Sequence, residues 1–115
     1  MPADCIFCQI IEGNAEGRII YEDDRAVAFW DRHPVAPIHI LIVPKKHIRS
    51  VNELRVEDEE LIGHLFLVAK QIAHEQGIAK EGYRLSINTG PNAGQSVYHL
   101  HVHLMAGRAL PIRLG

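Results

Sequence analysis

The pattern of short apolar runs, bounded by polar turns and glycines, predicts five β-strands. They are expected at residues 18–21, 26–30, 37–44, 83–88 and 97–106. These runs are rich in β-branched, aromatic or other apolar residues, and polar turns or glycines separate them. The third run ends at Pro44, which cannot donate a hydrogen bond to a neighbouring strand.

Two further segments carry apolar residues at helical spacing. Residues 5–11 predict a short helix that ends before Gly13, and residues 56–76 predict one long helix. The long segment begins with acidic residues 57–60, which favour a helix N-terminus, and Gly77 is suited to its end. Its apolar face consists of Leu61, Leu65, Val68, Ala69 and Ile72. Several strands with one long helix predict an α+β fold, in which helices pack on an antiparallel sheet.

Three histidines alternate with aliphatic residues in the run His99-Leu100-His101-Val102-His103-Leu104. Alternate side chains of a strand share a face, so the imidazoles are expected on one face and the core on the other. The core face is expected to hold Tyr98, Leu100, Val102 and Leu104. A lone histidine on a strand is usually solvent-facing or a hydrogen-bonded core residue, but three in strict alternation predict chemistry near neutral pH. The spacing leaves nucleophile and metal ligand open, because His-x-His on a strand also binds zinc.

The loop at residues 89–96 precedes the histidines and has features of an anion-binding site. Gly90 and Gly94 allow backbone N–H groups to approach an anion closely, while Asn88 and Ser96 add an amide and a hydroxyl. Phosphate recognition followed by an imidazole nucleophile or acid–base group is the simplest interpretation. The chain has no Gly-Lys-Ser/Thr phosphate loop, which argues against kinase-like chemistry.

Composition narrows the classes of function. The 115 residues are 47% hydrophobic and 23% charged, which is typical of one soluble domain. A formal net charge of −2 without a basic block argues against a nucleic-acid partner. The chain has neither a signal-peptide pattern nor an apolar run of the ~20 residues that span a membrane, so we expect a cytoplasmic protein without a membrane partner. In a reducing compartment the Cys5-x-x-Cys8 pair indicates metal or redox chemistry more often than a disulfide.

The run from His99 to Met105 resembles the signature of the histidine triad (HIT) superfamily, in which three histidines alternate with apolar residues. Residues 94–98, Gly-Gln-Ser-Val-Tyr, are similar to the Hint branch of purine nucleoside phosphoramidases. Further matches lie at residues 19–24, 36–39, 43–48, 82–84 and 88–90. The resemblance implies a single HIT domain over residues 1–115, with a five-stranded antiparallel sheet, one long helix and one short helix. It also implies a homodimer with one ten-stranded sheet, for which Phe66 and Leu67 are candidate contacts outside the main apolar face.

The resemblance implies a hydrolase that cleaves the P–N bond of purine nucleoside 5′-phosphoramidates. In this family the residue matching His101 attacks the α-phosphorus and forms a nucleotidyl-histidine intermediate. His103, His39 and Ser96 match residues that contact the phosphate and the leaving group. The implied nucleotide-binding set is Ile6, Phe7, Phe29, Asp31, Leu41, Asn88, Gly94, Gln95, Ser96, Val97, His101 and His103.

The physical chemistry of these residue types agrees with the implied roles. A carboxylate such as Asp31 accepts hydrogen bonds from the cis-diol of a ribose, and an apolar slot takes a purine face. Hydrogen-bond donors around the phosphate oxygens stabilise transition-state charge, so catalysis requires no metal. Considered alone, Asp31 could equally be a solvated turn residue, and Phe7, Phe29 and Leu41 would more often be ordinary core.

Several HIT relatives carry a structural zinc, and the resemblance implies the same here with Cys5, Cys8, His47 and His99 as ligands. Two thiolates at this spacing can bind one metal ion, and two distant histidines complete a tetrahedron. Four protein ligands leave no open position, so the zinc would be structural. The other interpretation is a pair of buried free thiols with His47 at the surface.

Residues next to Asp31 depart from the Hint pattern. Arg32 and His33 stand where these proteins usually have an aliphatic residue and a serine, and Trp30 is also unusual. Three alternatives stay open: a hydrolase of dinucleoside polyphosphates or other nucleoside phosphates, a nucleotide-binding regulatory protein with weak turnover, and a zinc protein whose histidines are all ligands.

Overall fold

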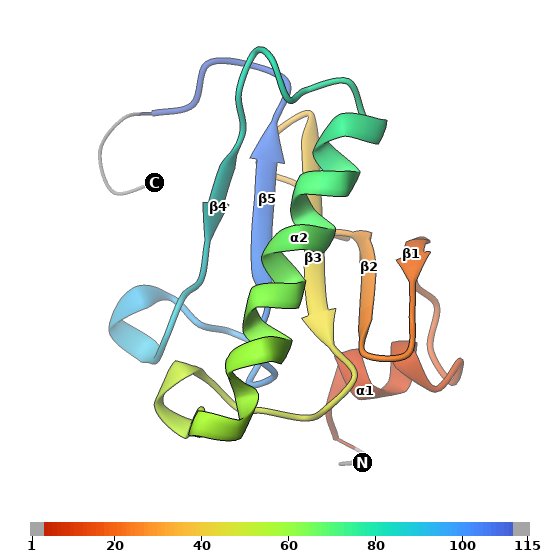
Figure 1. Cartoon of the computed structure of the whole chain (residues 1–115), viewed down its shortest axis with the longest axis vertical. Helices are drawn as coiled ribbons and strands as arrows, with labels where there is room; N and C mark the ends of the chain where they lie inside the picture. Colours follow the sequence, from red (N-terminus) through yellow and green to blue (C-terminus); the bar gives the residue numbers. More distant parts are fainter. Residues whose placement is uncertain (1–3, 112–115) are drawn as a thin grey trace.

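A five-stranded antiparallel sheet forms the centre of the computed structural model, which describes residues 4–111 (Figure 1). Along the sheet the strands follow the order β1-β2-β3-β5-β4, and each adjacent pair is antiparallel. The strands are β1 (Ile19–Glu22), β2 (Ala26–Trp30), β3 (Ile38–Pro44), β4 (Arg84–Ser86) and β5 (Val102–Ala106). This confirms the predicted α+β fold, and the strand predicted at 26–30 is found at those residues.

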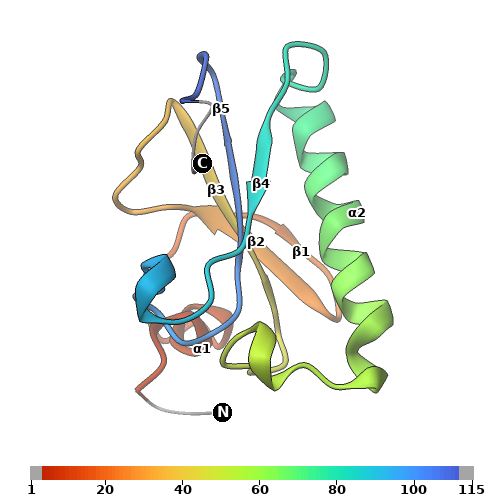
Figure 2. The same cartoon turned by 90° about the vertical axis from the view of Figure 1, so that its left-hand side faces the viewer.

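The two helices lie on opposite faces of the sheet (Figure 2). The long helix α2 (Glu59–Glu75) packs along β3, and a single 3₁₀ turn at Val56–Asp58 precedes it. The short helix α1 (Ile6–Ile11) begins at Cys5, whose Sγ accepts a hydrogen bond from the Cys8 N–H. Two more 3₁₀ turns occupy Val51–Glu53 and Pro91–Ala93.

Strand alternation divides the buried residues into two clusters, one on each face of the sheet. The cluster under α2 includes Ile40, Ile42, Val102 and Leu104 from the sheet, together with Leu65, Val68, Ala69 and Ile72 from the helix. The cluster on the other face includes Phe29, Leu41 and Val43, against which Phe7 and Ile10 of α1 pack. His39 alternates with Ile40, and His103 with Val102 and Leu104, so both imidazoles belong to the α1 face. The sheet therefore separates these two histidines from the core under α2.

The fifth strand is shorter than predicted. It begins at Val102 instead of residue 97, so His99 and His101 precede it. In the segment before it, Gln95 donates to the Val97 carbonyl, His101 donates to the His99 carbonyl, and the Leu100 N–H donates to the Ile48 carbonyl beyond the end of β3. Tyr98 is also not a core residue, since it is half-buried with the Arg49 guanidinium 5.0 Å from its ring centre.

Smaller differences lie at the ends of other elements. The fourth strand has three residues where six were predicted at 83–88, and the first is shifted by one residue. Among residues 4–111, no helix is long and apolar enough to cross a membrane.

Candidate active site and metal-binding cluster

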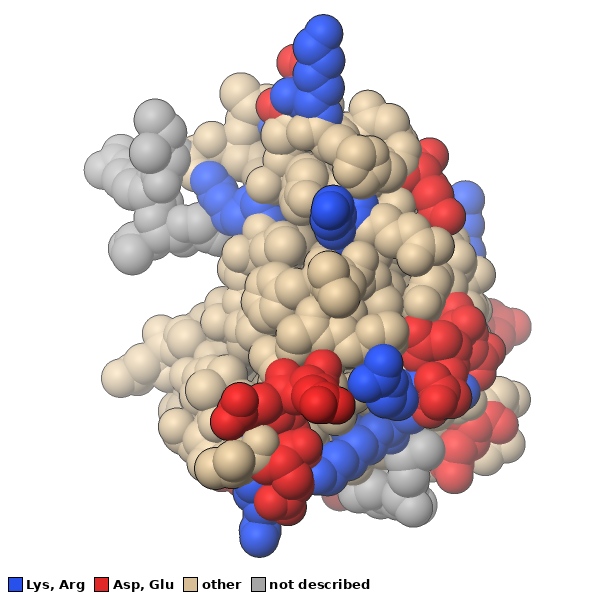
Figure 3. Space-filling view, in the orientation of Figure 1, with Lys and Arg blue, Asp and Glu red and all other residues tan. Residues whose placement is uncertain are grey.

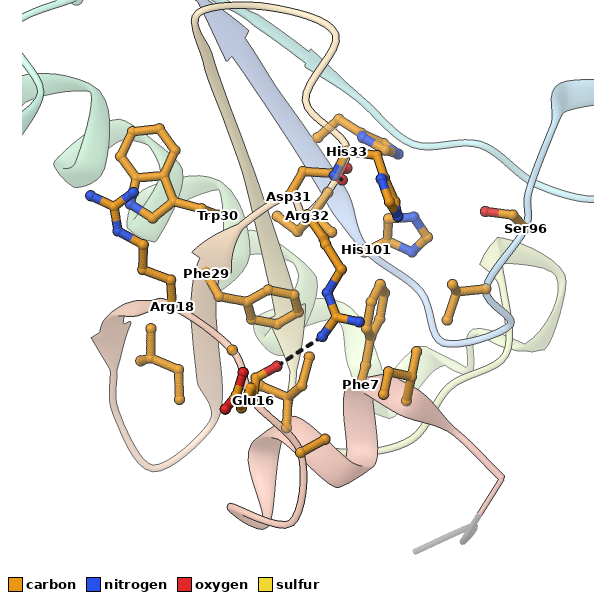
Figure 4. A pocket seen from close by; sticks show the side chains of 18 of the residues that line it. Phe7, Glu16, Arg18, Phe29, Trp30, Asp31, Arg32, His33, Ser96 and His101 are labelled. Carbon is orange, nitrogen blue, oxygen red and sulfur yellow. Dashed lines mark hydrogen bonds between the residues drawn. The ribbon is translucent and has the colours of Figure 1, made fainter.

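An open cavity of about 1100 Å³ lies on the α1 face of the sheet (Figure 4). Its walls come from α1, the following loop at residues 13–18, the ends of β1 and β2, β3, and the segment from Ser96 to His103. Nine predicted site residues line it: Ile6, Phe7, Phe29, Asp31, Leu41, Ser96, Val97, His101 and His103. The structure therefore brings the predicted purine slot, ribose carboxylate and histidines into one cavity.

Four other predicted site residues lie outside these walls. His39 is buried behind His103, and Asn88 follows the end of β4. Gly94 has a φ of +81°, a left-handed conformation that glycine adopts without strain. Gln95 is buried and braces the loop, because its Oε1 accepts from the Gly90 N–H and its Nε2 donates to the carbonyls of Arg49 and Val97.

Sequence reasoning missed one whole side of the cavity. The unpredicted lining residues are Ile10, Gly13, Asn14, Ala15, Glu16, Gly17, Arg18, Ile19, Trp30, Arg32 and His33. Most belong to the loop between α1 and β1, which carries no periodic or catalytic pattern. The departures from the Hint pattern at Trp30, Arg32 and His33 were the available signal, and all three residues line the cavity.

Two phenyl rings and the central histidine form the inner end of the cavity. The Phe7 and Phe29 ring centres are 5.3 Å apart with their planes at 67°, and both side chains are buried. The Phe7 ring also meets the His101 imidazole edge to face, at 5.1 Å and 87°. These contacts hold the imidazole against an apolar wall large enough for a planar base.

The backbone determines which nitrogen of His101 is available for chemistry. Its Nδ1 lies 2.7 Å from the His99 carbonyl oxygen, and a carbonyl only accepts, so Nδ1 carries the proton and donates. In the neutral ring Nε2 then has the lone pair. Burial lowers the pKa of His101 below its usual value of 6.5, which keeps the ring neutral at pH 7. His101 therefore has the tautomer and charge that a nucleophile needs.

His39 and His103 are hydrogen-bonded to each other beside His101, and the Asp31 carboxylate lies close to His39. His39 Nδ1 accepts from the Val35 N–H at 3.2 Å, which assigns the proton of the neutral ring to Nε2. That Nε2 donates to His103 Nδ1 at 2.9 Å and lies 3.3 Å from an Asp31 carboxylate oxygen. The three groups are near enough to hold a metal. A metal-binding Nε2 would need the proton on Nδ1, however, and the Val35 contact opposes that.

Burial keeps this histidine group neutral. It lowers the pKa of His39, against the opposing effect of the nearby Asp31 carboxylate, and it lowers the pKa of His103 to about 4. Adjacent imidazoles act in the same direction, because each opposes a second positive charge next to it. His39 and His103 are therefore both neutral at pH 7.

Cys5, Cys8, His47 and His99 form a second cluster, next to α1, that could hold a metal ion. Both cysteines are free thiols. The nearest ligand atoms are 3.1 Å apart between the two Nδ1 atoms, 3.3 Å for Cys5–His99 and Cys8–His47, and 3.5 Å for Cys8–His99. A tetrahedral zinc with these ligands needs separations of about 3.3–3.6 Å. The cluster therefore has the chemistry and nearly the dimensions of a structural zinc site.

The proton position on His99 favours a metal, whereas the Cys8 thiol has to lose its proton when a metal binds. His99 Nε2 donates to the Pro44 carbonyl at 2.8 Å, so the lone pair of the neutral ring lies on Nδ1, toward the thiols. Burial lowers the pKa of His99 to about 4. Burial and the neighbouring Cys5 raise the pKa of the Cys8 thiol to about 12. A buried thiolate needs a positive partner, which a zinc ion would supply.

Comparisons with known proteins agree with this geometry. A family model described as "Scavenger mRNA decapping enzyme C-term binding" matches residues 4–111. An uncharacterized HIT-like protein of Synechococcus elongatus is 50% identical over 110 residues, which cover 96% of each chain. The purine nucleoside phosphoramidase of Escherichia coli strain K12 is 46% identical over 110 residues, covering 96% of this chain and 92% of that one.

Solved structures with a similar fold also belong to proteins of the histidine triad type. A HIT family hydrolase from Legionella pneumophila superposes with a TM-score of 0.95 at 40% identity, covering 97% of this chain and all of the other. A histidine triad protein from Clostridium difficile superposes with a TM-score of 0.94 at 44% identity, covering 96% of each chain. Together with the neutral histidines that line the cavity, these matches show that the chain belongs to the histidine triad (HIT) family of hydrolases.

Proposed function

We propose that this enzyme hydrolyses the P–N bond of purine nucleoside 5′-phosphoramidates through a nucleotidyl intermediate on His101. The observation that carries the proposal is the hydrogen bond from His101 Nδ1 to the His99 carbonyl, which leaves Nε2 as the nucleophilic nitrogen of a cavity-lining imidazole. The 46% identity to a protein named purine nucleoside phosphoramidase supports this substrate class.

The proposed reaction has two displacements at phosphorus. In the first, the Nε2 lone pair of His101 forms a bond to the α-phosphorus, the P–N bond breaks, and the leaving nitrogen takes up a proton. In the second, water attacks the same phosphorus, the bond to Nε2 breaks, and the nucleoside monophosphate is released. His39 and His103, hydrogen-bonded to each other at 2.9 Å, would relay the protons, with the Ser96 hydroxyl near the leaving group.

Binding of the nucleotide would use the rest of the cavity. The base would lie in the apolar slot made by Ile6, Phe7, Phe29 and Leu41. The Asp31 carboxylate, whose Oδ1 accepts from the His33 N–H at 2.8 Å, would accept from the ribose hydroxyls. Ser96 and Val97 would border the phosphate, and Asn88, Gly94 and Gln95 would shape the loop that holds them. Gln95 supports this bracing role through its bonds to the Gly90 and Arg49 backbone.

The second proposed component is a structural zinc held by Cys5, Cys8, His47 and His99. When bound, the ion would join α1 to the segment that follows β3 and to the bend before β5. It would fix the carbonyl of His99, to which His101 donates. The zinc would thus hold the nucleophile in place while taking no part in bond breaking.

We also propose the homodimer that the family resemblance implies. β4 is an edge strand of the sheet, so a second copy could pair with it to form ten strands. On α2, Phe66 is 39% exposed and Leu67 is 65% exposed. Figure 3 shows that uncharged side chains occupy much of the central part of this face, while many acidic residues gather toward its lower part. Light scattering should give twice the chain mass, and a Phe66→Lys change should shift it toward the monomer. A monomeric native protein would exclude the dimer.

The proposed activity is tested by following AMP release from adenosine 5′-phosphoramidate. Native protein should turn the substrate over, and His101→Ala should abolish turnover while AMP still binds. His74→Ala is the matched control, because His74 is exposed on α2, on the opposite face of the sheet. Turnover that survives in His101→Ala would remove His101 as the nucleophile. Absence of turnover in all three proteins, tested also with guanosine 5′-phosphoramidate, would exclude the proposed reaction.

A further inference from the structure

Arg32 places a positively charged fork of hydrogen-bond donors in the cavity beside the aromatic slot. In Figure 4 its side chain extends into the cavity in the region of Phe7 and Phe29. Its Nη2 donates to the backbone carbonyl of Glu16 at 3.2 Å, across to the loop that follows α1. This single bond is exposed to solvent, so a ligand that offers better acceptors can displace it.

A local turn explains how two consecutive residues reach the same cavity. Within a strand, Asp31 and Arg32 would point to opposite faces of the sheet. The strand β2 ends at Trp30, and the Asp31 carboxylate then accepts from the His33 N–H, which turns the chain. Both side chains consequently line the cavity. A nucleoside whose ribose is held by Asp31 would therefore have its base within the region that Arg32 reaches.

The chemistry of the two purines differs on the edge that an arginine recognises. Guanine presents two neighbouring acceptors, O6 and N7, which accept both arms of a guanidinium. Adenine presents N7 beside the donor N6 amino group, so it offers that fork only one acceptor. An apolar slot alone takes either base, because the ring faces of the two purines are alike. A guanidinium beside the slot therefore favours guanine.

Arg18, the other arginine of the cavity, serves a different purpose. Its guanidinium lies 5.1 Å from the centre of the Trp30 ring, where the ring face attracts the cation. Arg18→Met is therefore a matched control for Arg32→Met. It removes the same charge from the same cavity, but from a guanidinium that contacts a tryptophan.

We propose that Arg32 is a specificity-determining residue that makes the site select guanosine over adenosine 5′-phosphoramidates. This selectivity rests on the proposed function in one respect, namely that the cavity binds purine nucleotides. It adds to that function the preferred base, guanine, and the residue that recognises it, Arg32.

The test measures kcat/KM for guanosine, inosine and adenosine 5′-phosphoramidates, and separately the Kd of GMP and AMP by calorimetry. Native protein should prefer guanosine by about 5- to 150-fold, the range for one bidentate arginine–guanine pair. Inosine keeps O6 and N7 but lacks the 2-amino group, so it should behave like guanosine. Arg32→Met should bring the guanosine and adenosine values within about twofold of each other, and Arg32→Lys should retain only part of the preference.

Three results would overturn the proposal: a native protein without guanine preference, an Arg32→Met protein with the native preference, or an Arg18→Met protein that loses the preference equally. The second result includes an equal loss of affinity for both purines, which would mean that Arg32 only connects to the loop at Glu16. If GMP binds more tightly than AMP in an Arg32-dependent way but no phosphoramidate is hydrolysed, the base selection stands and the proposed reaction fails.

Discussion

Replacing Asp31 with asparagine should remove most of the preference for ribose over deoxyribose. The carboxylate already accepts from the His33 N–H and lies 3.3 Å from His39 Nε2. A carboxylate has roughly four acceptor positions, and the hydrogen bond from His33 leaves about three for the ribose hydroxyls. Asparagine keeps the size and one acceptor oxygen but loses the charge.

The expected magnitude follows from the strength of hydrogen bonds to a charged acceptor. One such bond contributes about 1.5–3 kcal/mol, so removing the 2′-hydroxyl should weaken binding to the native protein roughly 10- to 150-fold. A neutral acceptor contributes about 0.5–1.5 kcal/mol, which predicts a loss of only roughly 2- to 10-fold in Asp31→Asn. The two substitutions should therefore be coupled by about 1–1.5 kcal/mol.

The assay is a double cycle of four dissociation constants, for AMP and 2′-deoxy-AMP with each protein. Asp24→Asn is the control, because it makes the same change in charge at an exposed turn residue outside the cavity. The control should bind both ligands as the native protein does, and thermal unfolding should confirm that both variants are folded. Equal affinity of the native protein for the two ligands, or an equal loss for both in Asp31→Asn, would refute the assignment of Asp31 to the ribose.

Three further predictions concern pH, metal and core. First, kcat/KM should be constant near neutrality and fall only at pH values below the ordinary imidazole pKa of about 6.5, because burial lowers the pKa of His101; an acid limb centred above that value would contradict the neutral nucleophile. Burial of neutral His103 also makes stability depend on pH. Its contribution to the free energy of unfolding is complete above pH 6.5 and is lost as the pH falls toward the folded pKa of about 4, so the denaturant midpoint of unfolding should decrease across that interval. Second, Cys8→Ser should reduce bound zinc from one per chain to nearly none and lower the Tm by about 10 °C for each 2 kcal/mol lost, whereas unchanged metal content would exclude the zinc site. Third, Leu104→Ala should destabilise the fold by about 2–5 kcal/mol, because Leu104 is fully buried under α2. At temperatures well below its Tm the variant should keep the KM of the native protein, since the cavity is on the other face of the sheet. A large rise in KM would contradict this separation.

The sequence predicted those elements whose apolar residues are buried in the core. β2 is an apolar run buried on both faces of the sheet, and the apolar face of α2 packs on the core under that helix, so both are found where the sequence placed them. The fifth strand was overpredicted for a related reason. The histidines do alternate in sequence, but before Val102 the backbone bonds to side chains and to Ile48, which follows β3, instead of continuing the ladder with β3.

The site was predictable to the extent that single side chains carry its chemistry. His101 and Asp31 were identified from their residue types and their resemblance to a family, and both line the cavity. The wall at residues 13–18 was not predictable, because a loop without periodicity gives no indication of what it will face. The tautomer of His101 was equally hidden, since it depends on a carbonyl whose direction only the folded backbone determines.

The most direct test of the account is to detect the covalent intermediate on His101. Native protein, mixed with guanosine or adenosine 5′-phosphoramidate and quenched under alkaline conditions within the first turnover, should gain the mass of one nucleotidyl group. Peptide mapping should place that group on His101, and His101→Ala should show no gain. Turnover by the native protein without any adduct, or an adduct on another histidine, would contradict the proposed mechanism.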